Sequence, residues 1–154
     1  MKNEKIVDIL NKLVVINNDR IEGYETAMGE TDEGDLQMMF RQFVATSSKC
    51  KQELTSEITK LGGDPDEGTK TSGKFFRAWM DVKAALTAHD RKAILNSCEF
   101  GEDNAVETYE KVLKDDVNEL TPELQTLVRS QFYLIKADHD KVRSMRDQVV
   151  SNPH

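Results

Sequence analysis

Hydrophobic residues recur along most of the chain at alternating spacings of three and four positions, the period of a helix with one buried face. Four long stripes of this kind predict helices over residues 3–28, 33–61, 90–114 and 122–150. A shorter stripe with an aromatic face, formed by Phe75, Phe76 and Trp79, predicts a further helix over residues 73–87. Turn-forming residues separate the stripes, and no segment alternates like a strand, so we expect an all-α chain.

The lengths of the connections predict how these helices are arranged. Short loops follow the first and the third long helix, which places each of them antiparallel to its successor. The second and third long helices are joined by about 28 residues, including the short helix, which we expect to lie as a strap across the bundle. Such a long crossover is the ferritin-like arrangement. We therefore expect residues 1–154 to form a single ferritin-like antiparallel four-helix-bundle domain.

Polar residues interrupt each long stripe near its middle. They are Asn17, Arg20, Ser47, Glu102, Gln131, Asp138 and His139. Antiparallel helices of matched length bring these positions to one level, where ferritin-like di-iron proteins hold metal with two glutamates and two Glu-x-x-His pairs. The helix over residues 33–61 contains no histidine, and His139 has Lys136 three positions before it where the pattern needs glutamate. Neither Glu-x-x-His pair is therefore present.

A core-facing Glu102 then needs a partner other than metal, because burying a lone carboxylate costs several kcal/mol. Arg20 is the expected partner. We predict that Arg20, Glu102 and Gln131, aided by Tyr24 or Tyr109, form a structural polar layer at the level where a di-iron protein holds metal. On this interpretation the protein needs no cofactor.

The alternative is a divergent site for iron or manganese. Its candidate ligands are Glu22, Glu53, Glu99, Glu102 and His139. Carboxylates and imidazole suit these ions. Glu22, Glu53 and Glu99 are at the same time expected on the solvated flanks of their helices, and a single histidine is more often a satisfied core or boundary residue than a ligand.

Composition narrows the classes of partner and compartment. The chain carries 28 acidic against 21 basic residues, a formal net charge of −7, and lacks the clustered Lys and Arg that bind nucleic acid or an anionic membrane. No apolar run approaches the roughly 20 residues of a membrane span, and the N-terminus lacks a signal-peptide core, so we expect a cytoplasmic protein. Cys50 and Cys98, without a CxxC motif, are expected to be buried free thiols.

Several short motifs carry a resemblance to a known family. They are Cys98-Glu-Phe-Gly-Glu-Asp103 followed by Tyr109, Arg77-Ala-Trp-Met80, Lys83-Ala-Ala-Leu86, Leu61-Gly-Gly-Asp-Pro65, and Lys136-Ala-Asp-His-Asp140 with Arg146-Asp147. Over nearly the whole chain the sequence resembles an uncharacterised bacterial family of ferritin-like four-helix-bundle proteins with a domain of unknown function. The resemblance implies the fold, a bacterial cytoplasmic location, no established enzymatic activity, and site positions at Glu22, Glu53, Glu99, Glu102 and His139. Arg20 departs from the Asp-Gly that the family tends to have there, and a cation at that level repels iron.

Three functional hypotheses follow. The leading one is a non-enzymatic ferritin-like bundle with a degenerate metal site, compatible with a stress-related role. The second is the divergent iron- or manganese-binding or oxidising protein described above. The third is an adaptor that binds a protein partner through the strap helix or a groove. No phosphate-binding loop or nucleophile motif favours an enzyme, and a homo-oligomer such as a dimer is compatible with each hypothesis.

Overall fold

The computed structural model describes residues 2–68 and 73–151, with the side chains of 2, 73–78 and 150–151 outside the description. It contains the helices α1 (Lys2–Glu30), α2 (Gly34–Lys60), α3 (Gly73–Thr87), α4 (Arg91–Lys111) and α5 (Pro122–Ser151). No strand occurs within the described ranges, and the predicted all-α fold class is confirmed. The expected aromatic face at Phe75 and Phe76 lies outside the described side chains.

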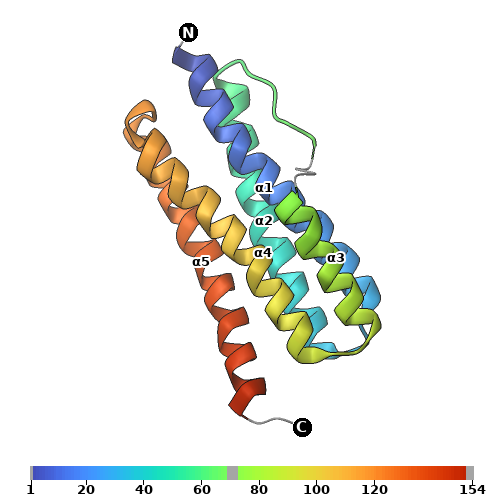
Figure 1. Ribbon diagram of the computed structural model, residues 1–154. Coiled ribbons are helices and arrows are strands. Elements are labelled where there is room, and N and C mark those ends of the chain that lie inside the picture. The colour runs from blue at the N-terminus through green and yellow to red at the C-terminus, as the bar shows by residue number, and fades with distance from the viewer. Residues whose placement is uncertain (1, 69–72, 152–154) are drawn as a thin grey trace.

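The four long helices form an antiparallel bundle built from two hairpins (Figure 1). α1 pairs with α2, and α4 pairs with α5. Between the hairpins the chain returns along the bundle as an extended segment and then as α3, which lies beside α1 and α4 (Figure 1). α2 and α4 therefore run in the same direction, as a long crossover requires. None of the described helices is long and apolar enough to cross a membrane.

The apolar core is divided into two clusters, one in each half of the bundle. The first contains Leu10, Leu13, Leu54, Ile58, Val128 and Ile135, among others. The second contains Leu36, Phe40, Phe43, Ile94, Leu95 and Val142, among others. The members of the two clusters lie on opposite sides of Arg20 on α1, of Ser47 on α2, of Glu102 on α4 and of Asp138 on α5. The polar layer therefore separates two ordinary hydrophobic cores.

Two asparagines on α1 hold the extended part of the crossover. Asn11 donates its side-chain amide to the carbonyl of Asp64 at 3.1 Å and accepts from the backbone N–H of Asp66 at 2.8 Å. Asn18 donates to the carbonyls of Asp66 and Gly68 at 3.1 and 2.9 Å. Because this segment has no neighbouring strand, the two side chains supply the partners that its backbone needs. The crossover is thereby fixed against α1.

α3 sits on α1 through the close approach of Trp79 to Gly23. A Cβ atom built on Gly23 would lie 2.3 Å from the indole ring of Trp79. The same indole meets the ring of Tyr24 edge-on, with 4.8 Å between the ring centroids. Because Gly23 has no side chain, the Trp79 ring of the strap helix α3 can pack directly against α1.

The connection between α4 and α5 differs from the expectation. The sequence predicted a helix continuing to residue 114, whereas α4 ends at Lys111 and is followed by a π-helical turn over Val112–Asp116 and a 3-10 turn over Val117–Glu119. The wider turn keeps Val112 buried while Lys114 and Asp115 are exposed. The spacing of hydrophobic residues resembles that of an α-helix here, so periodicity alone could not reveal the change of helix type.

We expect Gly23→Ala to destabilise the protein by about 1–3 kcal/mol, because the added methyl group collides with a ring rather than with a flexible chain end. Gly29→Ala is the matched control, since no atom lies within 4 Å of a Cβ at that position of the same helix. It should be neutral or stabilising by up to about 1 kcal/mol. Urea unfolding followed by circular dichroism measures both values. Equal stability of the two variants would contradict the close packing of Trp79 of α3 against Gly23.

Candidate functional site

The centre of the bundle is organised around Arg20 of α1, which is completely buried. Its Nε and Nη2 atoms donate to the two carboxylate oxygens of Glu102 on α4, at 2.9 and 2.6 Å. Nη2 also donates to Asp138 on α5 at 3.0 Å, and Nη1 donates to the hydroxyl of Ser47 on α2 at 2.6 Å. One side chain from α1 therefore binds one side chain from each of the other three long helices.

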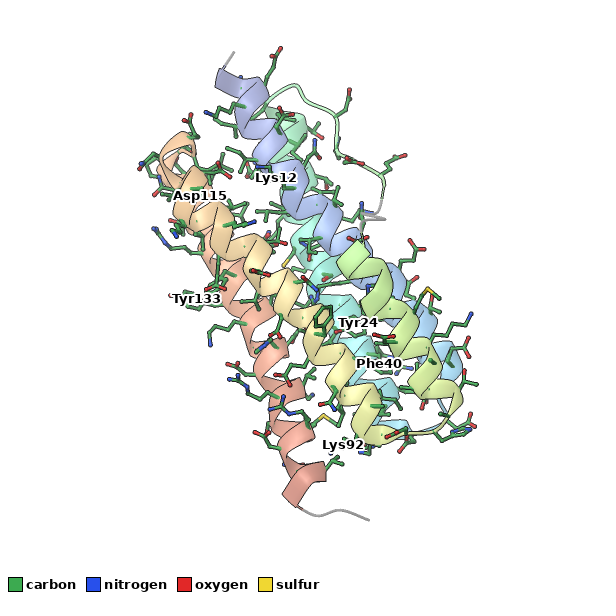
Figure 2. All side chains as sticks on the ribbon, in the orientation of Figure 1. Lys12, Tyr24, Phe40, Lys92, Asp115 and Tyr133 are labelled. Atoms are coloured by element: carbon green, nitrogen blue, oxygen red, sulfur yellow. The ribbon has the colours of Figure 1, made fainter. Side chains whose placement is uncertain are left out.

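Aromatic rings complete the surroundings of the guanidinium group. The rings of Tyr24 and Phe43 each have their centroid 5.6 Å from the Cζ atom of Arg20. Figure 2 shows Tyr24 in the interior of the bundle, in contrast to Tyr133 on the outer side of α5. Burial, and then the charge of Glu102, raises the pKa of Tyr24, so its hydroxyl stays neutral. The expected contribution of Tyr24 to the layer is made through its ring, by cation–π contact with Arg20.

The charge state of Arg20 is set by its carboxylate partners. Burial alone would lower the pKa of Arg20, but Glu102, with smaller contributions from Tyr24 and Asp138, raises it above its ordinary value. The guanidinium group is therefore charged at every accessible pH. Two buried carboxylates share this one cation. Breaking such a pair by removing one member typically costs about 3–5 kcal/mol, because a buried charge is left without compensation.

Gln131 belongs to a neighbouring hydrogen-bonded chain and does not bind Arg20 directly, which differs from its expected place in the layer. Asn17 donates to the hydroxyl of Tyr109 at 2.9 Å, and that hydroxyl donates to the Gln131 amide oxygen at 2.8 Å. The Gln131 amide nitrogen donates to the carbonyl of Cys50 and to Glu53, both at 3.1 Å. The buried hydroxyl of Tyr109 thus both accepts and donates a hydrogen bond, and burial raises its pKa.

The structure does not bring the five candidate metal ligands together. Glu22 is exposed, and Glu53 lies at the edge of the bundle between Gln131 and Lys49. Both oxygens of Glu102 accept from Arg20. Glu99 and His139 do meet, at the outer seam between α4 and α5.

That outer seam contains a third residue, Asp103. One potential ligand atom from each of Glu99, Asp103 and His139 lies within 4.8 Å of the other two. Asp103 is exposed and lies off the hydrophobic stripe, so sequence reasoning missed it. The sequence does place Asp103 one helical turn after Glu99, and residues four apart share a face of a helix, so this spacing could have identified it.

The residues at the centre do not fit the di-iron site of ferritin-like bundles. The guanidinium group of Arg20 occupies the space between the four helices, and both central carboxylates bind it. The imidazole of His139 points to Asp103 at the outer seam rather than into this layer. A divalent ion near Arg20 would be repelled by about 4 kcal/mol per unit of its charge, at 4 Å and an effective dielectric constant of 20.

The two cysteines are buried and free, as predicted. Burial raises the pKa of the Cys50 thiol to about 11. Burial, and then the charge of Glu102, also raises the pKa of Cys98 well above its ordinary value. Both thiols are therefore protonated at neutral pH and unsuited to nucleophilic chemistry.

Asp138 makes the stability of the central layer depend on pH. Burial raises the pKa of Asp138 above 3.8, although Arg20 opposes the shift. A carboxyl group with a raised pKa in the folded state contributes stability that is complete below its unfolded value and is lost as the pH rises through the folded value. Folding is therefore more favourable when Asp138 is neutral than when it is charged.

We expect Asp138→Asn to unfold at higher urea concentration than the wild type at pH 7–8, because the amide still accepts from Arg20 and carries no buried charge. The difference should shrink towards pH 4. Asp140→Asn is the control on the same helix. Asp140 is exposed and its pKa is lowered by His139, so its replacement should give no gain. A pH-independent effect of Asp138→Asn would contradict this assignment.

Comparisons with known proteins agree with this fold. The family model described as a domain of unknown function (DUF2383) matches residues 5–115. A solved structure of a Dps1 mutant from Mycobacterium smegmatis is similar with a TM-score of 0.73 and 16% sequence identity, covering 94% of this chain and 97% of that one. No curated protein sequence matches the chain. The chain has a ferritin-like fold and belongs to the DUF2383 family of proteins with a domain of unknown function.

Proposed function

We propose that this protein is a non-enzymatic ferritin-like bundle in which a permanent ion network takes the place of a central metal site. The observation that supports the proposal is the complete burial of Arg20 between Glu102 and Asp138. The network satisfies the charges that burial would otherwise leave uncompensated. It uses both oxygens of Glu102, which is one of the five candidate metal ligands.

The arrangement of the network explains why it is structural. Arg20 makes four hydrogen bonds to three different helices, so a shift of any one helix along its axis would break at least one of them. Each bond to a charged group is worth about 1.5–3 kcal/mol when its partner is removed. The layer thus fixes the relative heights of the four helices, a task that the two apolar clusters perform less specifically.

A bundle of this kind acts through its surface. The net charge of −7 disfavours nucleic acid and anionic membranes as partners, which leaves protein partners, including a second copy of the chain. Large hydrophobic side chains that remain exposed include Met38 on α2, Met80 on α3 and Tyr133 on α5. We therefore include homo-oligomer formation and a cytoplasmic binding role in the proposal.

The alternative of iron or manganese chemistry at the bundle centre receives little support from the positions of its ligands. Glu22, Glu53 and Glu102 lie apart from one another and from His139, and Glu102 is held by a cation. What remains of the alternative is the group at the seam of α4 and α5. That group lies outside the central layer.

Untagged protein, expressed with supplements of iron and manganese, tests the proposal by elemental analysis and by an assay of ferrous ion oxidation. We expect neither catalysed oxidation nor stoichiometric metal that depends on Glu102. Glu102→Gln should lower stability by about 1–3 kcal/mol, because Arg20 then keeps a weaker, neutral acceptor.

Glu107→Gln is the matched control, since Glu107 is exposed on the same helix. It should leave stability and metal content unchanged. Near-stoichiometric iron or manganese in the wild type that disappears in Glu102→Gln, but not in Glu107→Gln, would refute the proposed structural role of the centre.

A further inference from the structure

The outer seam between α4 and α5 carries its own polar group. Glu99 and Asp103 lie on consecutive turns of α4, and His139 faces them from α5. Their potential ligand atoms lie within 4.8 Å of one another. Two ligand atoms bound to one tetrahedral ion at about 2.0–2.2 Å lie about 3.4 Å apart, so Nε2 of His139 and Oδ1 of Asp103, now 2.5 Å apart, would have to separate. Asp103 is exposed, and a rotation of its side chain can supply that adjustment.

Both ring nitrogens of His139 face carboxylate oxygens. Nδ1 lies 3.2 Å from Oδ1 of Asp140, and Nε2 lies 2.5 Å from Oδ1 of Asp103. A neutral imidazole carries one proton and can donate to only one of these oxygens. Its other nitrogen would then direct a lone pair at a carboxylate. A metal ion bound by Nε2 and by Asp103 would remove this conflict, because Nδ1–H could then donate to Asp140.

Neighbouring basic residues pair with Glu99 and Asp140 but not with Asp103. Arg146 donates to Oε2 of Glu99, Arg143 lies 3.9 Å from Oε1 of the same carboxylate, and Lys136 lies 3.4 Å from Oδ2 of Asp140. Asp103 pairs with no lysine or arginine among the residues that the structure describes. Among the described carboxylates of this group, Asp103 is therefore the one that can take a further cation. Arg146 holds Glu99 in place beside Asp103 and His139.

We propose that Glu99, Asp103 and His139 bind one divalent transition-metal ion of the zinc class, with Nε2 of His139 as its nitrogen ligand. Asp140 accepts from Nδ1–H and so fixes the ring and its tautomer, as carboxylates commonly do for histidines that bind metal. One imidazole and two carboxylates favour zinc or cobalt over magnesium and calcium, which prefer oxygen ligands alone. Three protein ligands leave a position for water or for a ligand from a partner.

This site would link the two helices of the second hairpin. Glu99 and Asp103 flank Glu102 in the sequence, and His139 follows Asp138, so the inward residues bind Arg20 while their outward neighbours form the seam. An ion at the seam would therefore lie near the level of the central network without entering it. The inference is independent of whether the centre itself is structural.

Isothermal titration of untagged, metal-free protein with Zn²⁺ at pH 7.5 tests the site. We expect one ion per chain, and at least tenfold weaker binding in both Asp103→Asn and His139→Gln. Added Co²⁺ should give visible absorption bands that His139→Gln abolishes. Circular dichroism establishes whether each variant is folded, since Asp103 is exposed but His139 is buried.

Three controls make the outcome decisive. Glu107→Gln removes a charge one helical turn beyond Asp103 and should leave binding unchanged. His89→Gln tests an exposed histidine elsewhere and should also leave it unchanged. Saturable binding that survives Asp103→Asn and His139→Gln, or no binding at all, would overturn the site. Loss of the ion in Glu102→Gln alone would place it at the centre and contradict the proposed function as well.

Discussion

A charged arginine in the middle of a four-helix bundle is the constraint on which the rest of this structure depends. Once Arg20 points inward, its donors must find acceptors that do not come from water, and one acceptor is provided by each of the other three long helices. The bidentate pair with Glu102 supplies the principal counter-charge, while Asp138 adds a second carboxylate that the site tolerates rather than requires. The level of the layer thereby fixes the register of the bundle.

The parts of the fold around this layer have separate physical causes. Two apolar clusters supply most of the buried hydrophobic surface, one in each half of the bundle. The crossover depends on two asparagines of α1 and on the space above Gly23. These features would serve a metal-binding bundle equally well. The central layer is what separates the proposed structural role from a metal-binding one, since Arg20 binds both oxygens of Glu102, a candidate metal ligand.

Much of this could be predicted from the sequence, because helical periodicity determines which residues face inward. The all-α ferritin-like fold follows from four long stripes and one long crossover, and the structural similarity confirms it. The same periodicity placed Arg20 and Glu102 on facing stripes. It could not choose between Asp138 and His139, which are adjacent at the edge of one stripe. Only the packing of α5 shows that Asp138 turns inward and His139 outward.

The remaining differences also concern features that periodicity does not record. Gln131 lies in the predicted layer by its spacing, yet its hydrogen bonds lead to Tyr109 and Glu53. Asp103 is exposed, and a pattern of buried positions gives no reason to consider it. Its importance depends on how closely α5 approaches α4, which is a property of the folded pair of helices.

The most direct test of the account is a double-mutant cycle between Arg20→Met and Glu102→Gln, measured by urea unfolding at pH 7. Arg20→Met alone should cost about 3–5 kcal/mol, because two carboxylates are left buried without a cation. The double variant should be more stable than the sum of the single effects predicts, by about 1–3 kcal/mol. Effects that add to within about 0.5 kcal/mol would show that the two residues are not coupled, and would contradict the central role assigned to their ion pair.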